Sequence, residues 1–223
     1  MENKTGILIF SRSTLAECSV KKFNGNHSFF ESQKKRLEAL CAKTGLDVIW
    51  FGEKHQKGKN FGERFCHSIA SVFSKGYDSL IIIGNDCPQL KFNHLQSSIK
   101  SLESGNASLG RCFDGGFYLL GIQKKHFKYS EFINLSWNSH KVSNELVKSL
   151  KPKVEIDFLS IFKDVDNQSD FLSLLDFSKQ LYTDVILILK RILKFFNIHF
   201  QDPTLFVKEG VTGVYFNKAP PSV

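Results

Sequence analysis

A carboxylate follows a short apolar run near the middle of this chain. Asp86 comes two residues after Gly84, which ends the apolar run Leu80–Ile83, and Pro88 stands just beyond it. Such a run is typical of a buried strand that a glycine and a proline end in a turn. In open α/β sheets, ligands bind beyond the carboxyl ends of the strands. We therefore expect Asp86 to face a binding crevice, where its oxygens could hold Mg²⁺ or Mn²⁺ against a phosphate.

A second group of carboxylates, Asp164 and Asp166, follows the apolar stretch Phe158–Phe162. Alternate residues of an extended chain point to the same side, so both carboxylates can offer oxygens to one divalent ion. The other interpretation is structural, because Asp166 or Asn167 can cap a helix that includes Phe171. The residues alone leave both interpretations open.

Two adjacent glycines, Gly115 and Gly116, follow Asp114 and precede the apolar run Phe117–Ile122. Because glycine has no Cβ atom, this backbone can approach a ligand closely and adopt a positive φ. Asp114 can hydrogen-bond a ligand hydroxyl or its own turn. An isolated Asp-Gly-Gly is more often a plain turn. The case for a binding role therefore rests on its position after the Asp86 segment.

The pattern of apolar residues predicts the elements that must position these side chains. Strands are expected at 6–10, 47–51, 80–83, 107–110 and 117–122, and helices at 32–44, 61–75 and 92–103. Gly45 and Gly76 stand just past the ends of the first two helices. Alternating strands and helices predict an α/β fold with three layers, α/β/α, Rossmann-like, around a mostly parallel, mixed sheet.

The composition is that of a globular protein with a core rich in phenylalanine. The chain has 223 residues, 22 phenylalanines and a formal net charge of +8. Its lysines are scattered, which argues against a nucleic-acid partner. The 5 cysteines form no Cys-x-x-Cys pair, so neither a disulfide framework nor a zinc site is expected. The N-terminal residues lack the long apolar region of a secretory signal, and we expect a cytoplasmic protein.

The last part of the chain, residues 178–223, is expected to form a helical extension and a tail. Apolar residues recur on one helical face of residues 180–200, but lysines and an arginine interrupt them, which excludes a transmembrane segment. We expect this face to pack on the main domain, residues 1–177, or on a second subunit in a homodimer, rather than on a membrane surface. Residues 201–223 are expected to add a short strand or hairpin and then fray.

The order of these motifs resembles that of a known bacterial family. Behind an apolar first strand, the chain carries Gly58-x-x-x-Gly62-x-Arg64, Gly84–Pro88, Asp114–Tyr118, Trp137 and Asp164–Asp166. This order is similar to that of bacterial transferase-like proteins of unknown physiological role, built on the glycosyltransferase-A fold. They are nucleotide-diphospho-sugar transferase-like and distantly similar to the molybdenum-cofactor and phospholactate guanylyltransferases. The resemblance covers about residues 5 to 177.

The resemblance implies a transferase that binds a nucleotide or nucleotide-sugar and moves a glycosyl or nucleotidyl group to a small-molecule acceptor. Asp86 and Asp166 would hold the cofactor, Mg²⁺ or Mn²⁺, and Asp86 and Asp114 would be the catalytic carboxylates. Nucleotide or substrate contacts would come from Arg12, Lys21, Lys22, Arg64, Asn85, Gly115, Gly116 and Trp137. Arg64 and Trp137 also have structural interpretations, as a salt-bridged helix residue and as a packing anchor.

The first loop departs from the family pattern. Many relatives carry a segment there with glycine and proline, followed by lysine, threonine and arginine, which cradles a triphosphate. Residues 11–23 contain neither glycine nor proline, and Glu17 would oppose a phosphate, although Arg12, Lys21 and Lys22 keep positive charge nearby. The alternative function is therefore a non-catalytic binding or interaction protein that retains the transferase scaffold.

Overall fold

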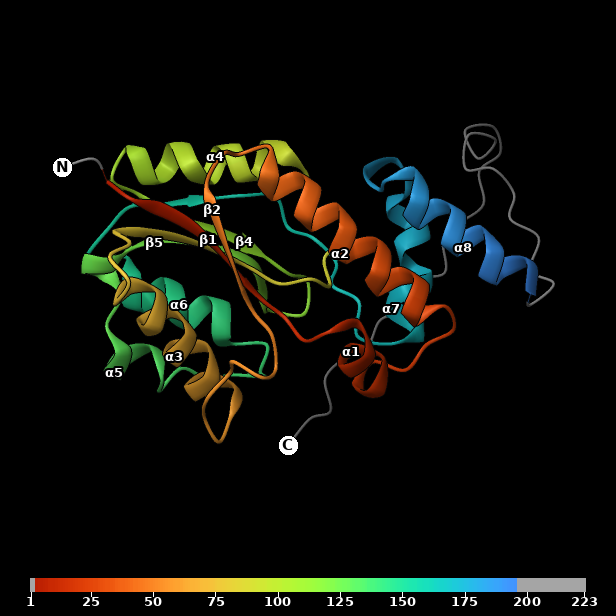
Figure 1. The fold of residues 1–223 in the computed structure, drawn as a ribbon, viewed down its shortest axis with the longest axis horizontal. Coiled ribbons are helices and arrows are strands. Elements are labelled where there is room, and N and C mark those ends of the chain that lie inside the picture. Colours follow the sequence, from red (N-terminus) through yellow and green to blue (C-terminus); the bar gives the residue numbers. More distant parts are fainter. Residues whose placement is uncertain (1–2, 196–223) are drawn as a thin grey trace, which may run out of the picture.

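The computed structural model describes residues 3–195, in which a single sheet lies between two layers of helices (Figure 1). Within these residues the sheet has six strands in the order β2-β1-β3-β5-β4-β6. The strands are β1 (Thr5–Phe10), β2 (Asp47–Phe51), β3 (Ser79–Ile83), β4 (Ala107–Arg111), β5 (Phe117–Gln123) and β6 (Ile156–Phe158). Only β5 runs antiparallel to its neighbours, β3 and β4. This mostly parallel, mixed sheet confirms the expected fold class.

The helices divide into two layers and one group at the end of the sheet (Figure 1). One layer contains α2 (Asn26–Ala42) and α4 (Phe92–Glu103), and the other contains α3 (Phe61–Phe73), α5 (Tyr129–Phe132) and α6 (Val142–Leu150). The end group consists of α1 (Thr14–Val20), α7 (Gln168–Ser173) and α8 (Thr183–Phe195). Short 3₁₀ helices, η1 (Lys124–His126) and η2 (Leu174–Gln180), complete the described elements.

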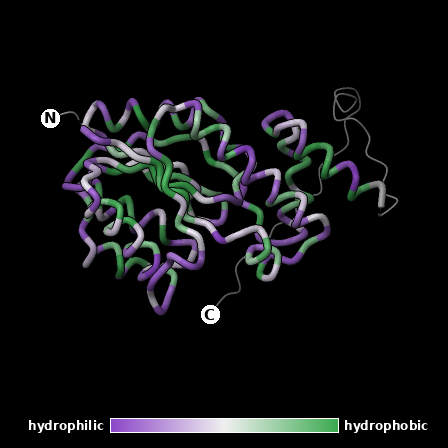
Figure 2. Tube along the Cα trace, in the orientation of Figure 1, coloured by the Kyte–Doolittle hydropathy of each residue, from purple (hydrophilic) through white to green (hydrophobic). Residues whose placement is uncertain are grey.

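Strand β3 shows why its sequence is an uninterrupted apolar run. Ile81 and Ile83 pack into the cluster that contains residues of α2 and α4. Leu80 and Ile82 pack on the opposite face, with α3 and α6. A strand that is covered on both faces needs apolar side chains at every position. Figure 2 shows this apolar centre, with hydrophilic residues along the surrounding helices.

Near the N-terminus, two helical segments differ from the expectation. The predicted helix 32–44 begins earlier, at Asn26, directly after Gly25 with its φ of 78°. Its first turns place Phe29 and Phe30 in a third apolar cluster, whereas Leu37 faces the sheet. The apolar side of α2 thus changes along the helix. A prediction based on a single regular apolar face therefore misses the first turns of α2. Helix α1 was not expected, because residues 11–23 were only compared with the phosphate-binding loop of the family.

The third apolar cluster joins α8 to α2, α7 and η2. Its buried members are Phe23, Phe29, Phe30, Val165, Phe171, Leu174, Leu181, Val185, Leu189 and Ile192. The expectation that the C-terminal helix packs on the main domain is therefore confirmed for α8, while a homodimer stays a prediction. No helix among residues 3–195 is long and apolar enough to cross a membrane. The strand or hairpin expected in residues 201–223 lies outside the described residues.

Candidate functional site

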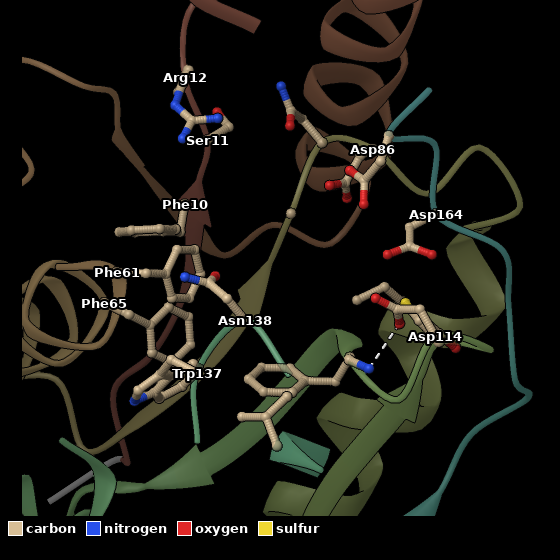
Figure 3. A pocket seen from close by; sticks show the side chains of 18 of the residues that line it. Phe10, Ser11, Arg12, Phe61, Phe65, Asp86, Asp114, Trp137, Asn138 and Asp164 are labelled. Carbon is tan, nitrogen blue, oxygen red and sulfur yellow. Dashed lines mark hydrogen bonds between the residues drawn. The ribbon is translucent and has the colours of Figure 1, made fainter. Parts of the chain in front are cut away.

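A cavity of about 740 Å³ lies where β1 and β3 end and β5 begins. Its two sides differ chemically (Figure 3). The aromatic side chains of Phe10, Phe61, Phe65 and Trp137 line one side, which we call the aromatic wall. Carboxylates line the other side, which we call the acidic wall: Glu17, Asp86, Asp114, Asp164 and Asp166. The β3 turn and the segment after β6, distant in sequence, thus contribute to one wall.

Lys21 reaches from the end of α1 into the acidic wall. Its Nζ lies 2.6 Å from Asp86 Oδ2 and 2.7 Å from Asp166 Oδ1. Burial opposes the charge of Lys21, but the carboxylates of Asp86, Asp166 and Glu17 outweigh this effect and raise its pKa. Lys21 is therefore an ammonium that bridges the two carboxylates to which the resemblance assigns a metal ion.

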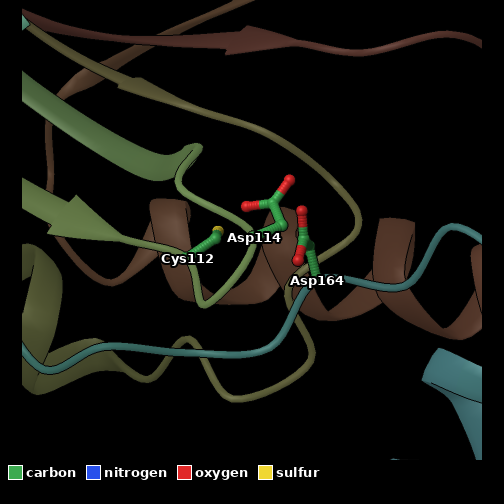
Figure 4. Close-up of side chains that lie close together, drawn as sticks. All are labelled: Cys112, Asp114 and Asp164. Carbon is green, nitrogen blue, oxygen red and sulfur yellow. The ribbon is translucent and has the colours of Figure 1, made fainter. Parts of the chain in front are cut away.

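Asp164 and Asp114 line the same cavity, and Figure 4 shows them next to Cys112. One potential ligand atom from each of the three residues lies within 4.8 Å of the others. Burial and the charges of Asp86, Asp114 and Asp166 raise the pKa of Asp164 to about 7. Burial also raises the pKa of the Cys112 thiol, which stays protonated and is a weak ligand for a hard cation. Asp114 and Asp164 therefore add two carboxyl groups to the wall outside the Lys21 bridge, and Asp164 is partly protonated near pH 7.

Hydrogen bonds hold the two acidic segments together. The backbone N–H of Val165 donates to the carbonyl oxygen of Asp86 at 3.1 Å. The buried Gln89 accepts a hydrogen bond from the backbone N–H of Lys163 at 2.7 Å. Val165 itself is fully buried in the third apolar cluster. Because Val165 points into the core, Asp164 and Asp166 on either side of it line the cavity.

The Asp-Gly-Gly segment forms a tight turn. The N–H of Gly116 donates to Asp114 Oδ1 at 2.7 Å (Figure 3). Gly115 has a φ of +91°, and a Cβ atom there would lie 2.1 Å from the carbonyl oxygen of His140. Gly116 lines the cavity, whereas Gly115 is not among its lining residues and serves the close approach to His140.

The other predicted binding residues divide into two groups. Arg12, Arg64 and Asn85 line the cavity. Arg12 forms an ion pair with the buried Glu17 at 3.7 Å, so Glu17 holds a cation at the cavity as well as contributing a negative charge. Lys22 is exposed and is not among the lining residues. The structure thus brings most of the predicted residues together but leaves Lys22 and Gly115 outside the lining of the cavity.

Trp137 both packs and lines the cavity. Its ring centroid lies 4.9 Å from that of Phe65 and 5.4 Å from that of Phe61. Its Nε1 donates to the carbonyl oxygen of Phe132 at 2.9 Å. A Cβ atom at Gly62 would lie 2.3 Å from the indole, so the Gly62 position needs glycine for this contact. The indole N–H of Trp137 therefore anchors the side chain to the protein, as the packing interpretation expects, while the ring forms part of the aromatic wall.

Sequence reasoning missed several features of the site. Phe61 and Phe65 were interpreted only as the apolar face of a helix, although they also line the cavity. Cys112 lies beside two carboxylates with no signal in its spacing. Nothing in the sequence connects Lys21 with Asp86, because the two residues are 65 positions apart.

A second cavity, of about 540 Å³, adjoins the first at the ends of β1 and β2. The two cavities share Ser11, Arg12 and Asn85 among their lining residues. Trp50 and His55 line only the smaller one. The ends of β2, β1 and β3 together therefore offer room for a ligand with two parts.

A match to a protein family covers the middle of the chain, including the turn after β3, the Asp-Gly-Gly turn and Trp137. The family is described as "Uncharacterized protein conserved in bacteria". Residues 33–139 match the DUF2064 family. Over these residues the match agrees with the resemblance to a bacterial family that the motif order indicates. A comparison with curated proteins found no match.

One solved structure has the same fold, and two others are less similar. A protein from Desulfovibrio desulfuricans G20, provisionally described as a nucleotide-diphospho-sugar transferase, has a TM-score of 0.69 and 20% identity, over 88% of this chain and 99% of that chain. A Leptospira borgpetersenii cytidylyltransferase has a TM-score of 0.44 and 13% identity, over 87% and 96%. A Mycobacterium tuberculosis H37Rv protein in complex with manganese has a TM-score of 0.44 and 17% identity, over 78% and 98%. The first of these similarities confirms the fold class expected from the sequence.

Proposed function

We propose that this protein is a divalent-metal-dependent transferase. It binds a nucleotide or nucleotide-sugar and moves a glycosyl or nucleotidyl group to a small-molecule acceptor in the cytoplasm. The observation that carries the proposal is the cavity with an acidic and an aromatic wall at the carboxyl ends of β1 and β3. In α/β sheets this edge is the usual place for ligands.

The acidic wall supports a cation site. The oxygens of Asp86 and Asp166 lie within 2.7 Å of one position, which the ammonium of Lys21 takes in this structure. Two carboxylate oxygens around one cation fit Mg²⁺ or Mn²⁺, and Asp114 and Asp164 lie alongside. When bound, the ion would neutralise negative charge on the transferred or leaving phosphate.

The remaining lining residues would bind and orient the substrates. Arg12 and Arg64 would contact phosphate oxygens, since a guanidinium presents several donors to them. The aromatic wall would stack on a nucleobase or cover the apolar face of a sugar. Gly116 gives the acceptor close access to the backbone of the turn. Holding donor and acceptor in one cavity is itself a source of rate enhancement.

A thermal-shift screen of nucleoside triphosphates and nucleotide-sugars, with and without Mg²⁺ or Mn²⁺, tests this function. We expect a metal-dependent shift, because a ligand at 100 times its dissociation constant stabilises a protein by about 2.7 kcal/mol. Asp86→Asn should abolish the metal-dependent part. Asp176→Asn is the matched control, since Asp176 is exposed in η2 and does not line the cavity. A metal-dependent shift that survives Asp86→Asn would contradict the assigned role of Asp86.

A non-catalytic binding protein is the second candidate, and the first loop favours it. This segment forms helix α1, whose residues Glu17 and Lys21 take part in the acidic wall. A helix in this place differs from the open, glycine-containing loop that cradles a triphosphate. The absence of any shift with all nucleotides tested would favour this candidate over a transferase.

A further inference from the structure

The cation position of the acidic wall is filled by a side chain of the protein itself. Lys21 Nζ lies 2.6 Å from Asp86 and 2.7 Å from Asp166. A divalent ion held by the same two oxygens would lie about 2.0–2.6 Å from each of them. The ammonium and the ion would therefore occupy the same place, and only one of them can be there at a time.

We propose, on the basis of the function proposed above, that Lys21 competes with the divalent ion for the position between Asp86 and Asp166. In the free protein the lysine keeps this position closed. A phosphate-bearing ligand in the cavity offers the ammonium another partner, and the ion then takes the two carboxylates. Metal and phosphate ligand consequently strengthen the binding of each other.

The surroundings of Lys21 limit its movement to the side chain. Its backbone N–H donates to the carbonyl oxygen of Glu17 at 2.7 Å, and its carbonyl oxygen accepts from Asn26 Nδ2 at 3.1 Å. Phe23, two residues further on, is buried in the third apolar cluster. The flexible four-carbon side chain lines the cavity and can carry the ammonium toward a ligand without a change of the backbone.

The negative charge of the acidic wall attracts both the ammonium of Lys21 and a divalent ion. Lys21 is only 11% exposed, and its ammonium is the cation that lies directly between Asp86 and Asp166. If that charge is removed, the two carboxylates face each other unneutralised at the edge of the cavity. They then attract a divalent ion more strongly than in the wild-type protein.

Manganese binding without any nucleotide tests the competition. The dissociation constant of Mn²⁺ is measured by electron paramagnetic resonance of the free ion for wild-type protein, Lys21→Gln and Lys153→Gln. Lys153 is a matched control, since it is a partly buried lysine in an ion pair with Glu131 outside the cavity. We expect Lys21→Gln to bind Mn²⁺ at least tenfold more tightly than the wild type, and Lys153→Gln to be unchanged. Adding Asp86→Asn to Lys21→Gln should remove the gain.

An equal or weaker affinity of Lys21→Gln for Mn²⁺ overturns the competition. If Asp86→Asn also removes Mn²⁺ binding from the wild type in that case, the proposed metal site remains and only the role of Lys21 is wrong. If the wild-type protein binds none of the nucleotides tested, the proposed function is wrong. The Mn²⁺ affinities would still decide the competition.

A second measurement needs no variant of Lys21. Acetylation of lysines in the wild-type protein is followed by mass spectrometry with and without saturating Mn²⁺. We expect Lys21 to react slowly without the ion and at least several-fold faster with it, while the exposed Lys151 reacts equally in both. Unchanged protection of Lys21 when Mn²⁺ is bound would show that the ion and the ammonium do not exclude each other.

Discussion

At the scale of single residues, the site brings several carboxyl groups together, and one of them is only partly ionised near pH 7. Asp164 lies among Asp86, Asp114 and Asp166, and its pKa is raised to about 7, mainly by burial and then by these charges. Around pH 7 this carboxyl holds its proton in about half of the molecules. A cation near Asp164 would therefore be bound in exchange for a proton.

Asp164→Asn is expected to stabilise the metal-free protein in a pH-dependent way. An aspartate in the unfolded chain ionises with an ordinary pKa near 3.8, whereas the folded Asp164 keeps its proton up to about pH 7. The wild type therefore loses stability as the pH rises through this window, by at most about 1.4 kcal/mol per pH unit, and then stays constant. Asparagine has no such loss. Urea unfolding between pH 4 and pH 8 should show the advantage of Asp164→Asn growing up to pH 7.

The control for this prediction is Asp176→Asn, because Asp176 is exposed and lies outside the cavity. This variant should follow the pH profile of the wild type. A difference between Asp164→Asn and wild type that is the same at pH 4 and pH 8 would mean that ionisation of Asp164 has no part in the effect.

At the scale of elements, turns decide where the functional side chains lie. The turn at Gly115 is packed directly against the backbone of the segment that contains His140. The N–H of Ser143 also donates to the carbonyl oxygen of Gly115 at 3.1 Å. The start of α6 is thereby tied to the turn that carries Asp114, so the acidic wall depends on an element with no charged residue in the cavity.

Gly115→Ala is expected to lower the free energy of unfolding by roughly 2 kcal/mol or more. The alanine would have to adopt a φ of +91°, and its Cβ atom would lie 2.1 Å from a backbone carbonyl oxygen. Gly116→Ala is the matched control, since its Cβ atom would meet the movable carboxylate of Asp114 at 3.0 Å. Urea unfolding compares the two variants. Equal losses of stability would show that the contact with His140 does not constrain the turn.

At the scale of the whole molecule, the third apolar cluster connects the C-terminal helix to the site. Phe23, next but one to Lys21, and Val165, between Asp164 and Asp166, both belong to this cluster. Val185 and Leu189 of α8 belong to the same cluster. A helix that sequence reasoning treated as an extension to residues 1–177 thus supports both the cation and the carboxylates of the acidic wall.

Leu189→Ala is expected to destabilise the protein by about 2–5 kcal/mol, because it leaves a cavity in this cluster. Leu189 is 1% exposed, whereas Leu187 in the same helix is 61% exposed. Leu187→Ala should therefore change stability by less than about 0.5 kcal/mol. Both variants are compared by urea unfolding. If both effects are small, α8 is an independent extension and the predicted boundary after residue 177 is a domain boundary.

Much of the fold could be predicted from the sequence because local patterns carry it. The strands at 47–51 and 80–83 and the helix at 92–103 agree with the structure to within a residue. Strands buried on both faces need apolar runs, and a surface helix needs one apolar face. Helix α1 and the first turns of α2 could not be predicted in this way, since they pack on the end of the sheet with α7 and α8.

The sequence by itself determined five of the six described strands, the carboxylates near strand ends and the positive charge of the first loop, since each depends on neighbouring residues. Only the tertiary structure decided which of these groups meet. Lys21 and Asp86 are 65 positions apart, and they meet because the end of α1 and the turn after β3 line the same cavity. Likewise, Phe61 and Trp137 form one aromatic wall because α3 and the loop before α6 cover the same face of the sheet. Chain segments distant in sequence are joined by packing, and no local pattern records which side chains that packing brings together.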